Sequence, residues 1–389
     1  MKKKLIAVAV AGALGVPVVA AAQTSTVTIS GRAYVEYGYT NTGSNATGTQ
    51  NRVNSDALQT GGSNIAIKGE ESLGGGLSAW YQCESTADPR GQGDNSFCSR
   101  NSALGFKGGF GNVFLGNWDT PFKRARIQTG SGDTGFFGTS GPLTGHSTST
   151  LDGASPSLFA RRQNNSINYE TPKFSGFGVQ ASTSTTNNAT ARTSSAPNDK
   201  PRLVSVAGTY DNGPLKVTAA YERHNDFYSS ATWAGDESGY LFGASYTFAN
   251  KLTLGGMYTR QKWDDTATTS GKVSAWQIGI DWMFSGPHGI RAAYTAAGDV
   301  KGNSAAVALR PAACTGTVCG AETGVRMYQA RYVYAFSKRT EVAVGFNHVK
   351  NDRLAGYNIN GIGNTGGTGA NNGFGGKHTA YAIGIDHRF

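Results

Sequence analysis

Long segments of the chain alternate between apolar and polar residues with a period of two. In the segment 27–39 the odd positions carry valine, isoleucine, alanine and tyrosine, and arginine and glutamate stand among the even ones. The pattern returns at 215–222, 275–284, 327–336, 341–347 and 381–386. Strands in soluble domains are usually about five or six residues long, so runs of this length predict long strands with one apolar and one polar face.

The connections between these runs are short and long in turn. Short ones lie at 71–76, 108–111, 172–176, 211–214, 250–251, 285–288 and 337–340, and long ones at 41–61, 85–97, 119–159, 187–200, 225–238, 264–271, 298–324 and 351–377. Short turns at one end and long loops at the other are typical of outer-membrane barrels. Counting the runs predicts an all-β fold, an antiparallel transmembrane β-barrel of about sixteen strands of roughly ten residues. A barrel of that size leaves an aqueous channel.

Composition agrees with β structure. The chain has 55 Gly among 389 residues, with aromatic residues at 11% and charged residues at 15%. Disordered segments are poor in aromatic residues and rich in charge, and helical repeats need alanine, leucine, glutamate and lysine at helical spacing. A soluble β-sandwich also alternates. Here, however, the apolar face ends in aromatic residues and the polar face is charged along its length, which favours a membrane barrel. An exported β-sandwich adhesin is the second hypothesis.

The first 22 residues have the three parts of a secretory signal. Lys2–Lys4 are basic, Leu5–Val19 are apolar, and Ala20–Ala22 are small. The apolar part is shorter than the ~20 residues of a spanning helix. We therefore expect a signal peptide at 1–22 and a barrel domain at 23–389. Removing three lysines and no acids leaves a net charge of 32 − 25 = +7.

Four cysteines lie in the part expected to be exported. An even number in an oxidising compartment predicts two disulfides, Cys83–Cys98 and Cys314–Cys319. No C-x-x-C motif or suitably spaced histidine points to a metal. The G-x-G-x-x-G match at 361–366 lies in a Gly/Asn loop, without the strand and helix that a nucleotide site needs. Positive charge is dispersed outside Lys123–Arg126, which argues against nucleic-acid binding. We expect no enzyme and no cofactor.

Several motifs, taken in order, point to one family. They are Val27–Gly31, Gly69–Leu77, Gly108–Val113, Asn168–Pro172, Ser337–Thr340 and Gly384–Phe389. On these residues the chain resembles the trimeric general porins of β-proteobacteria, outside the variable long loops. The resemblance implies a homotrimeric outer-membrane channel for passive diffusion of small hydrophilic solutes and ions. Its partners would be outer-membrane lipid, lipopolysaccharide and, through Phe389, the outer-membrane assembly machinery.

The resemblance also implies that the third long loop, 119 to about 159, folds inward and narrows the channel. The loop begins with a basic segment that contains Lys123, Arg124 and Arg126. In anion-selective members of the family, arginines on the wall face this loop. Arg100 and Arg162 match two such positions, whereas a third falls on Asn64.

Alternation places further basic residues toward the lumen, namely Arg32, Lys68, Lys216, Arg291 and Arg331. Fixed positive charge in a narrow wet pore lowers the energy of anions in it, and arginine stays ionised at any ordinary pH. We therefore predict a constriction with anion preference, formed by Arg32, Lys68, Arg100, Lys123, Arg124, Arg126 and Arg162. In the alternative interpretation the inward bases placed by alternation are solvated wall residues paired with the acids Glu36, Glu70, Glu222 and Asp281. A substrate-specific channel is also compatible with the sequence.

Overall fold

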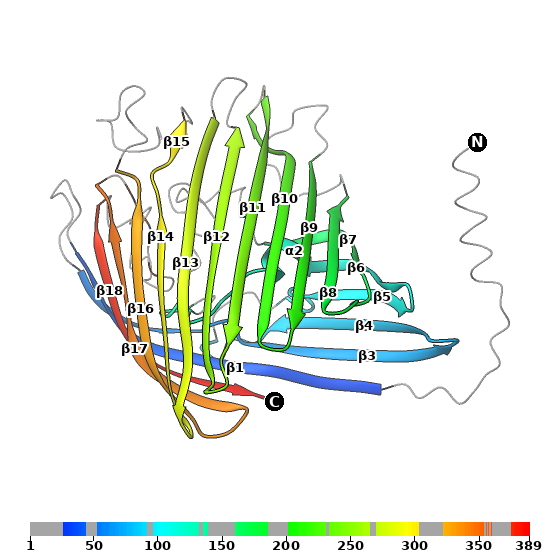
Figure 1. The fold of residues 1–389 in the computed structure, drawn as a ribbon, viewed down its shortest axis with the longest axis horizontal. Helices are drawn as coiled ribbons and strands as arrows, with labels where there is room; N and C mark the ends of the chain where they lie inside the picture. Colours follow the sequence, from blue (N-terminus) through cyan, green and yellow to red (C-terminus); the bar gives the residue numbers. More distant parts are fainter. Residues whose placement is uncertain are drawn as a thin grey trace.

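One antiparallel sheet forms almost the whole of the described structure, and it closes on itself as a barrel. The computed structural model describes residues 26–43, 53–91, 96–131, 135–138, 159, 161–185, 201–230, 233–264, 270–302, 322–353, 355, 357, 359 and 375–389. Figure 1 shows the strands following one another around the wall, from blue β1 to red β18. In these residues no helix is long and apolar enough to cross a membrane.

The sheet has 18 strands, and consecutive wall strands are joined by turns or loops. Their bounds are β1 (Thr26–Thr42), β2 (Val53–Gln59), β3 (Asn64–Gly74), β4 (Leu77–Thr86), β5 (Ser102–Gly108), β6 (Gly111–Asp119), β7 (Arg162–Glu170), β8 (Phe177–Ser184), β9 (Arg202–Asn212), β10 (Leu215–Ser230), β11 (Trp233–Thr247), β12 (Leu252–Asp264), β13 (Ser270–Ser285), β14 (His288–Ala297), β15 (Lys301–Gly302), β16 (Val325–Ala335), β17 (Thr340–Asn351) and β18 (Lys377–Arg388). We call the side of the short connections the turn end and the side of the long ones the loop end.

The barrel wall contains sixteen strands, as the alternation predicts. β2 pairs with the loop-end half of β1 and β3 with its turn-end half, so these two segments occupy one position in the wall. The two-residue β15 only extends the edge of β13. The wall therefore has 18 − 2 = 16 strands.

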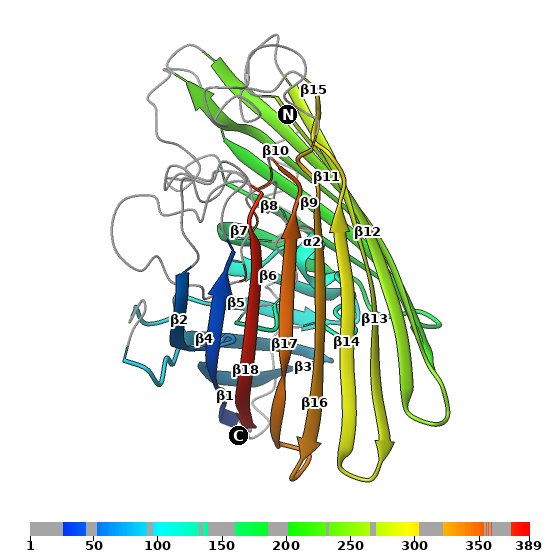
Figure 2. The same cartoon turned by 90° about the vertical axis from the view of Figure 1, so that its left-hand side faces the viewer.

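Pairing between the first and last strands closes the sheet. β1 and β18 run side by side from Arg32↔Arg388 to Thr42↔His378 (Figure 2). Gly31 and Phe389 add two reciprocal backbone hydrogen bonds of 2.9 and 3.1 Å. Closure pairs the edges that an open sheet leaves unpaired. It also rules out the β-sandwich of the second hypothesis, which needs two packed sheets.

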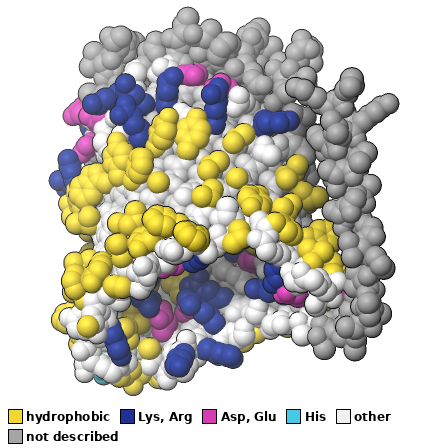
Figure 3. Space-filling view, turned by 45° about the vertical axis from the view of Figure 1, so that its right-hand side comes forward, with side chains coloured by type: hydrophobic (Ala, Val, Ile, Leu, Met, Phe, Trp, Pro, Cys, Tyr) yellow, Lys and Arg dark blue, Asp and Glu magenta, His cyan; other side chains and the backbone are white. Residues whose placement is uncertain are grey.

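The two faces of each strand are inverted relative to a soluble protein. On β13 the outward side chain of Trp276 is 41% exposed, whereas the inward Gln277 is 2% exposed. Figure 3 shows the consequence as a broad apolar band on the outer surface. Large contiguous apolar surfaces mark contact with a membrane or a partner.

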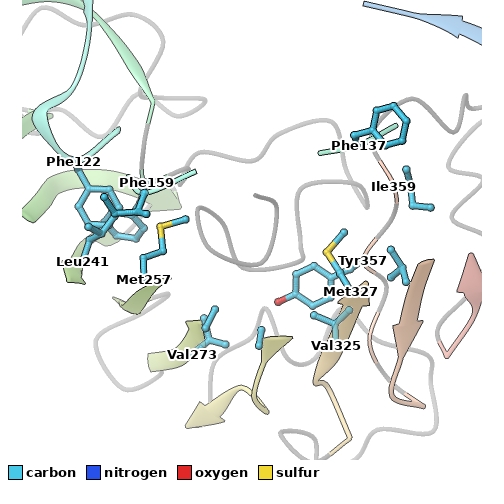
Figure 4. Close-up of a cluster of buried hydrophobic side chains, with 14 of the residues drawn as sticks. Phe122, Phe137, Phe159, Leu241, Met257, Val273, Val325, Met327, Tyr357 and Ile359 are labelled. Carbon is cyan, nitrogen blue, oxygen red and sulfur yellow. The ribbon is translucent and has the colours of Figure 1, made fainter. Parts of the chain in front are cut away.

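One group of the buried apolar residues lies inside the barrel, between the wall and the loop that follows β6. In Figure 4, Phe122 and Phe159 lie beside Leu241 and Met257, which belong to β11 and β12. Phe122 and Phe159 pack ring to ring, with centroids 5.8 Å apart. This confirms that the loop folds inward.

Two local features can be compared with the sequence predictions. Among the described residues, alternation did not predict the short helix α2 (Pro121–Arg124). The Thr120 side chain caps it by accepting a hydrogen bond from the Lys123 amide, and Pro121 suits a first helical turn. The Cys83–Cys98 disulfide is confirmed. Cys314, Cys319 and the predicted signal peptide lie outside the described residues.

Candidate pore constriction

The loop after β6 crosses the lumen along the inner wall. It starts with α2, which packs against β8, β9 and β10. There the Phe122 amide donates to the Ser205 hydroxyl at 3.1 Å. Thr129 then passes β12 and β13, and Phe136 reaches β1. The loop thus covers the inner face from β8 round to β1.

Wall glycines make room for this path. A Cβ added at Gly279 would lie 2.0 Å from the Thr129 carbonyl oxygen. One added at Gly38 would lie 2.5 Å from the Phe136 ring. Any side chain at these positions would collide with the loop, because real Cβ atoms do not approach other heavy atoms this closely.

Polar side chains of the wall bind the loop backbone. Asp281 accepts from the Gly130 amide at 3.1 Å, and Glu36 accepts from the Phe136 amide at 2.6 Å and from the Tyr34 hydroxyl. Asn347 donates to the carbonyls of Phe136 and Gly138 at 2.9 and 3.0 Å. Glu36 and Asn347 are fully buried. Since buried polar groups need partners, each contact fixes the position of the loop.

These contacts divide the lumen into two parts. The covered wall is the inner face of β8–β18 and β1, over which the loop lies. We call the inner face of β3–β7 the open wall, because the described residues of the loop form no such backbone contacts with its side chains. These loop residues leave the space beside the open wall for solutes.

The open wall carries Arg100 and Arg162, the two residues that sequence analysis placed opposite the loop. Arg100 pairs with Glu84 at 2.6 Å. Arg162 pairs with Asp119 at 3.2 Å, and Lys123 of α2 binds the same carboxylate at 2.9 Å. The Arg100 and Arg162 side chains are 24% and 19% exposed, so both still reach water.

Three bases therefore surround two acids at this place. Arg162 also donates to the Asn101 side chain at 2.9 Å, which joins it to the segment that holds Arg100. The structure thus brings Arg100, Arg162 and Lys123 together, and within the described part of the chain these three bases pair with two acids. Sequence analysis did not identify Glu84 or Asp119 as their partners.

The other predicted residues lie elsewhere. Arg124 pairs with Glu170, and Arg126 is buried with its Nε donating to the Lys123 carbonyl at 3.1 Å. Both therefore help to shape the base of the loop. Lys68 is exposed on β3, in a separate pocket that Glu70 and Lys107 also line.

Arg32 lies on β1 beside the first strand of the open wall, since its register partner on β3 is Asn64. Its guanidinium forms a bidentate salt bridge with the Asp386 carboxylate, with N–O distances of 2.8 and 2.9 Å. Its partner is therefore not Glu36, one of the acids named in the alternative interpretation. Arg32 borders a cavity of about 280 Å³ that contains further charges of both signs, namely Arg291, Arg331, Arg388, Asp281 and Glu341. Alternation had correctly predicted Arg291 and Arg331 to face inward.

Sequence analysis missed a buried charged cluster where the loop returns to the wall. The His224 ring lies between Glu222 and Glu237 at 3.0 and 2.8 Å, and Phe159 stacks on it at 4.8 Å. Burial lowers the pKa of nearby Arg161, against the pull of the two carboxylates. Glu222 and His224 both stand at inward positions of one strand, and this was the available signal. Among the described residues no group of His, Cys, Asp and Glu could hold a metal ion.

Comparison with known proteins identifies the family of this barrel. The sequence profile of the Gram-negative porins matches residues 7–354. The chain belongs to the Gram-negative porin family. This porin is thus a passive channel of the bacterial outer membrane, as the sequence motifs indicated.

Individual relatives have low sequence identity to this chain or match only part of it. Outer membrane porin protein 32 of Delftia acidovorans is 27% identical over 309 residues, which cover 76% of this chain and 79% of that one. An outer membrane porin protein of Bordetella pertussis is 26% identical over 353 residues, covering 84% and 82%. The major outer membrane protein P.IB of Neisseria gonorrhoeae is 31% identical, but over 118 residues, or 30% of each chain.

Solved structures share the fold. The anion-selective porin from Comamonas acidovorans matches with a TM-score of 0.69 at 22% identity, covering 94% of this chain and 100% of that one. The OmpT outer membrane protein of Vibrio cholerae, in a trimer form, matches with a TM-score of 0.63 at 16% identity, covering 94% and 100%.

Proposed function

We propose that this porin is a non-specific diffusion channel that prefers anions and is not an enzyme. The observation that carries the proposal is the group that Arg100 and Arg162 of the open wall form with Lys123 of α2. Among the residues that the structure describes, its three positive charges pair with Glu84 and Asp119. A permeating ion must pass this group, because the loop covers the opposite wall.

The ion pairs set the expected strength of the preference. Each pair is partly exposed to water, where an opposite charge about 4 Å away contributes about 1 kcal/mol. The partners therefore weaken the positive field without cancelling it, since one base remains in excess. The result is a moderate attraction for chloride and small organic anions, rather than a tight binding site.

The remaining predicted residues have lesser roles in this proposal. Arg124 and Arg126 hold the base of the loop, while Arg32 and Lys68 contribute background charge to the lumen. The name of the Comamonas acidovorans porin, which describes that protein as anion-selective, agrees with this proposal.

We also propose a homotrimer that is exported with a signal peptide at 1–22 and assembled as a barrel at 23–389. The trimer form of the Vibrio cholerae protein with the same fold supports the first part. Recognition of Phe389 by the assembly machinery belongs to the same proposal. The backbone N–H and C=O of Phe389 both pair with Gly31, so insertion of the last strand and closure of the sheet occur together.

Single-channel recording under a KCl gradient tests the proposal. We expect current steps in threes and a reversal potential that favours chloride. The Arg100→Ala/Arg162→Ala variant should lower the chloride-to-potassium permeability ratio by up to about fivefold, the equivalent of about 1 kcal/mol. The control is Arg223→Ala/Arg326→Ala, which removes two ion-paired arginines that lie outside the lumen.

Three outcomes would count against it. A cation preference of the unaltered porin would overturn the proposed anion preference. An equal shift of the permeability ratio in the control would show that the overall charge of the porin, and not the open wall, sets the ion preference. Saturable block of the current by one class of solute would favour a substrate-specific channel instead.

A further inference from the structure

Arg331 is a buried arginine for which the proposed pore has no use. It stands at an inward position of β16, and only 9% of the residue is exposed. Its guanidinium forms no hydrogen bond or ion pair with any residue that the structure describes. The buried Glu36 does not pair with it and instead accepts the Phe136 amide and the Tyr34 hydroxyl. A buried charge without a partner is costly, so Arg331 calls for an anion.

The neighbours of Arg331 in the sheet do not supply that anion. Its register partner on β14 is Arg291, and on β17 it is Gly345. Like charges directly opposite one another destabilise a sheet. The loop contributes the Phe137 ring, whose centroid lies 5.1 Å from the guanidinium carbon of Arg331. An aromatic face attracts a cation, but it does not accept the hydrogen bonds that a carboxylate would accept.

Arg331 lines the cavity of about 280 Å³ on the covered wall that Arg32 also borders. Gln128 and Ser131 of the inward loop line the same cavity. Arg388 lines it too, and because that side chain is 64% exposed, the cavity communicates with water. The cavity therefore has room for a small organic molecule, which could enter from the water beside Arg388.

The acids of the cavity already have other partners. Among the described residues, four bases and three acids line it. Arg291 pairs with Glu341 at 2.5 and 2.9 Å and lies 3.7 Å from Asp281. Arg32 holds Asp386 in the bidentate salt bridge described above. One positive charge is therefore in excess, and it belongs to the base that has no partner.

We propose that this cavity is a binding site for the carboxylate of a small organic acid, with Arg331 as its main ligand. A guanidinium presents two parallel N–H groups that match the two oxygens of a carboxylate. One negative charge balances the one base in excess. A phosphate carries about −1.5 to −2 at pH 7, so the three acids of the cavity would repel it more strongly.

The proposed site is separate from the path of permeating ions. Diffusion along the open wall needs no bound molecule on the covered wall. The carboxylate would instead lie where Gln128 and Ser131 meet the wall, and Phe137 of the same loop lies over its arginine. A ligand that binds only the folded state raises stability in proportion to its occupancy. We therefore expect the bound carboxylate to stabilise the loop on the covered wall.

Equilibrium dialysis of radiolabelled butyrate against the folded, detergent-solubilised porin tests this proposal. The variant is Arg331→Gln. Its matched control, Arg326→Gln, makes the same change on the same strand, at an outward position where the arginine pairs with Asp352. The unaltered porin and the control should bind one butyrate per chain. Arg331→Gln should bind it about tenfold more weakly or worse, because a charge-assisted pair is lost.

Several results would overturn the proposal. They are the absence of saturable butyrate binding by the unaltered porin, equal affinities of Arg331→Gln and Arg326→Gln, and displacement of butyrate by inorganic phosphate at an equal concentration. Arg100→Gln/Arg162→Gln tests the location. It should bind butyrate like the unaltered porin, and a loss of binding in this variant alone would place the ligand on the open wall instead.

A second variant keeps the test independent of folding defects in Arg331→Gln. Ala343→Leu retains every charge but fills part of the cavity, since Ala343 lines it from β17. It should also weaken butyrate binding about tenfold, and unchanged affinity of the folded variant would contradict the proposal. Folding is checked by the heat-induced gel shift, whose midpoint should rise with butyrate concentration in the unaltered porin only. Dialysis measures no current, so its result does not depend on the proposed anion preference.

Discussion

The covered wall and the open wall are built from the same kind of alternating strand, yet they use their charged residues differently. On the covered wall, Glu36 and Asp281 accept backbone amides of the inward loop and become part of its support. On the open wall, Arg100 and Arg162 pair with acids but stay in contact with water. A charged side chain that points into the lumen therefore does not contribute to ion selectivity on that ground alone. What decides its role is whether the loop lies over it.

The most severe way to disturb this difference is to push the loop off the covered wall. Gly279→Val places a side chain where the Thr129 backbone lies, so we expect a loss of about 3 kcal/mol or more in stability and a larger single-channel conductance. Stability can be followed by the midpoint of the heat-induced gel shift. The control is Gly208→Val, since nothing lies within 4 Å of the added Cβ at that position. Similar results for the two variants would mean that the loop does not depend on the space at Gly279.

A milder change removes one polar support. Asn347→Ala leaves the carbonyls of Phe136 and Gly138 without their donor, which should cost about 1–3 kcal/mol. We expect larger fluctuations of the open-channel current as the loop loosens. Asn117→Ala is the matched change on the open wall, where that amide donates to the carbonyls of Ser99 and Arg100. If Asn117→Ala raised the current noise equally, the distinction between the two walls would fail.

The smallest expected effect concerns charge alone. Asp119→Asn removes the carboxylate that Arg162 and Lys123 share, so the excess positive charge on the open wall rises. The chloride-to-potassium permeability ratio should increase, by up to about fivefold. Asp281→Asn removes one acid from the covered wall and should leave the ratio nearly unchanged. A larger shift in Asp281→Asn than in Asp119→Asn would reverse the roles of the walls.

Part of the pore site could be predicted from the sequence, because it depended on local pattern or on a matched motif. Alternation correctly placed Arg32, Arg291 and Arg331 inside, and the family motifs marked Arg100 and Arg162. The partners of these residues could not be predicted. Arg32 pairs with Asp386, 354 positions away, and only the closure of the sheet brings the two together. Glycines such as Gly279 indicated the path of the loop only weakly, since a glycine at an inward position is also compatible with an ordinary strand.

The sequence by itself determined the barrel, its inverted faces and its short and long ends. Each of these follows from properties that repeat every second residue or lie within one turn, so no distant contact is needed to specify them. The tertiary structure alone decided the path of the loop, and with it which charges are covered and which meet the passing ion. That path depends on hydrogen bonds from Glu36, Asp281 and Asn347 to the overlying loop, whose residues lie up to 211 positions away in the sequence. Such contacts exist only after the sheet has closed.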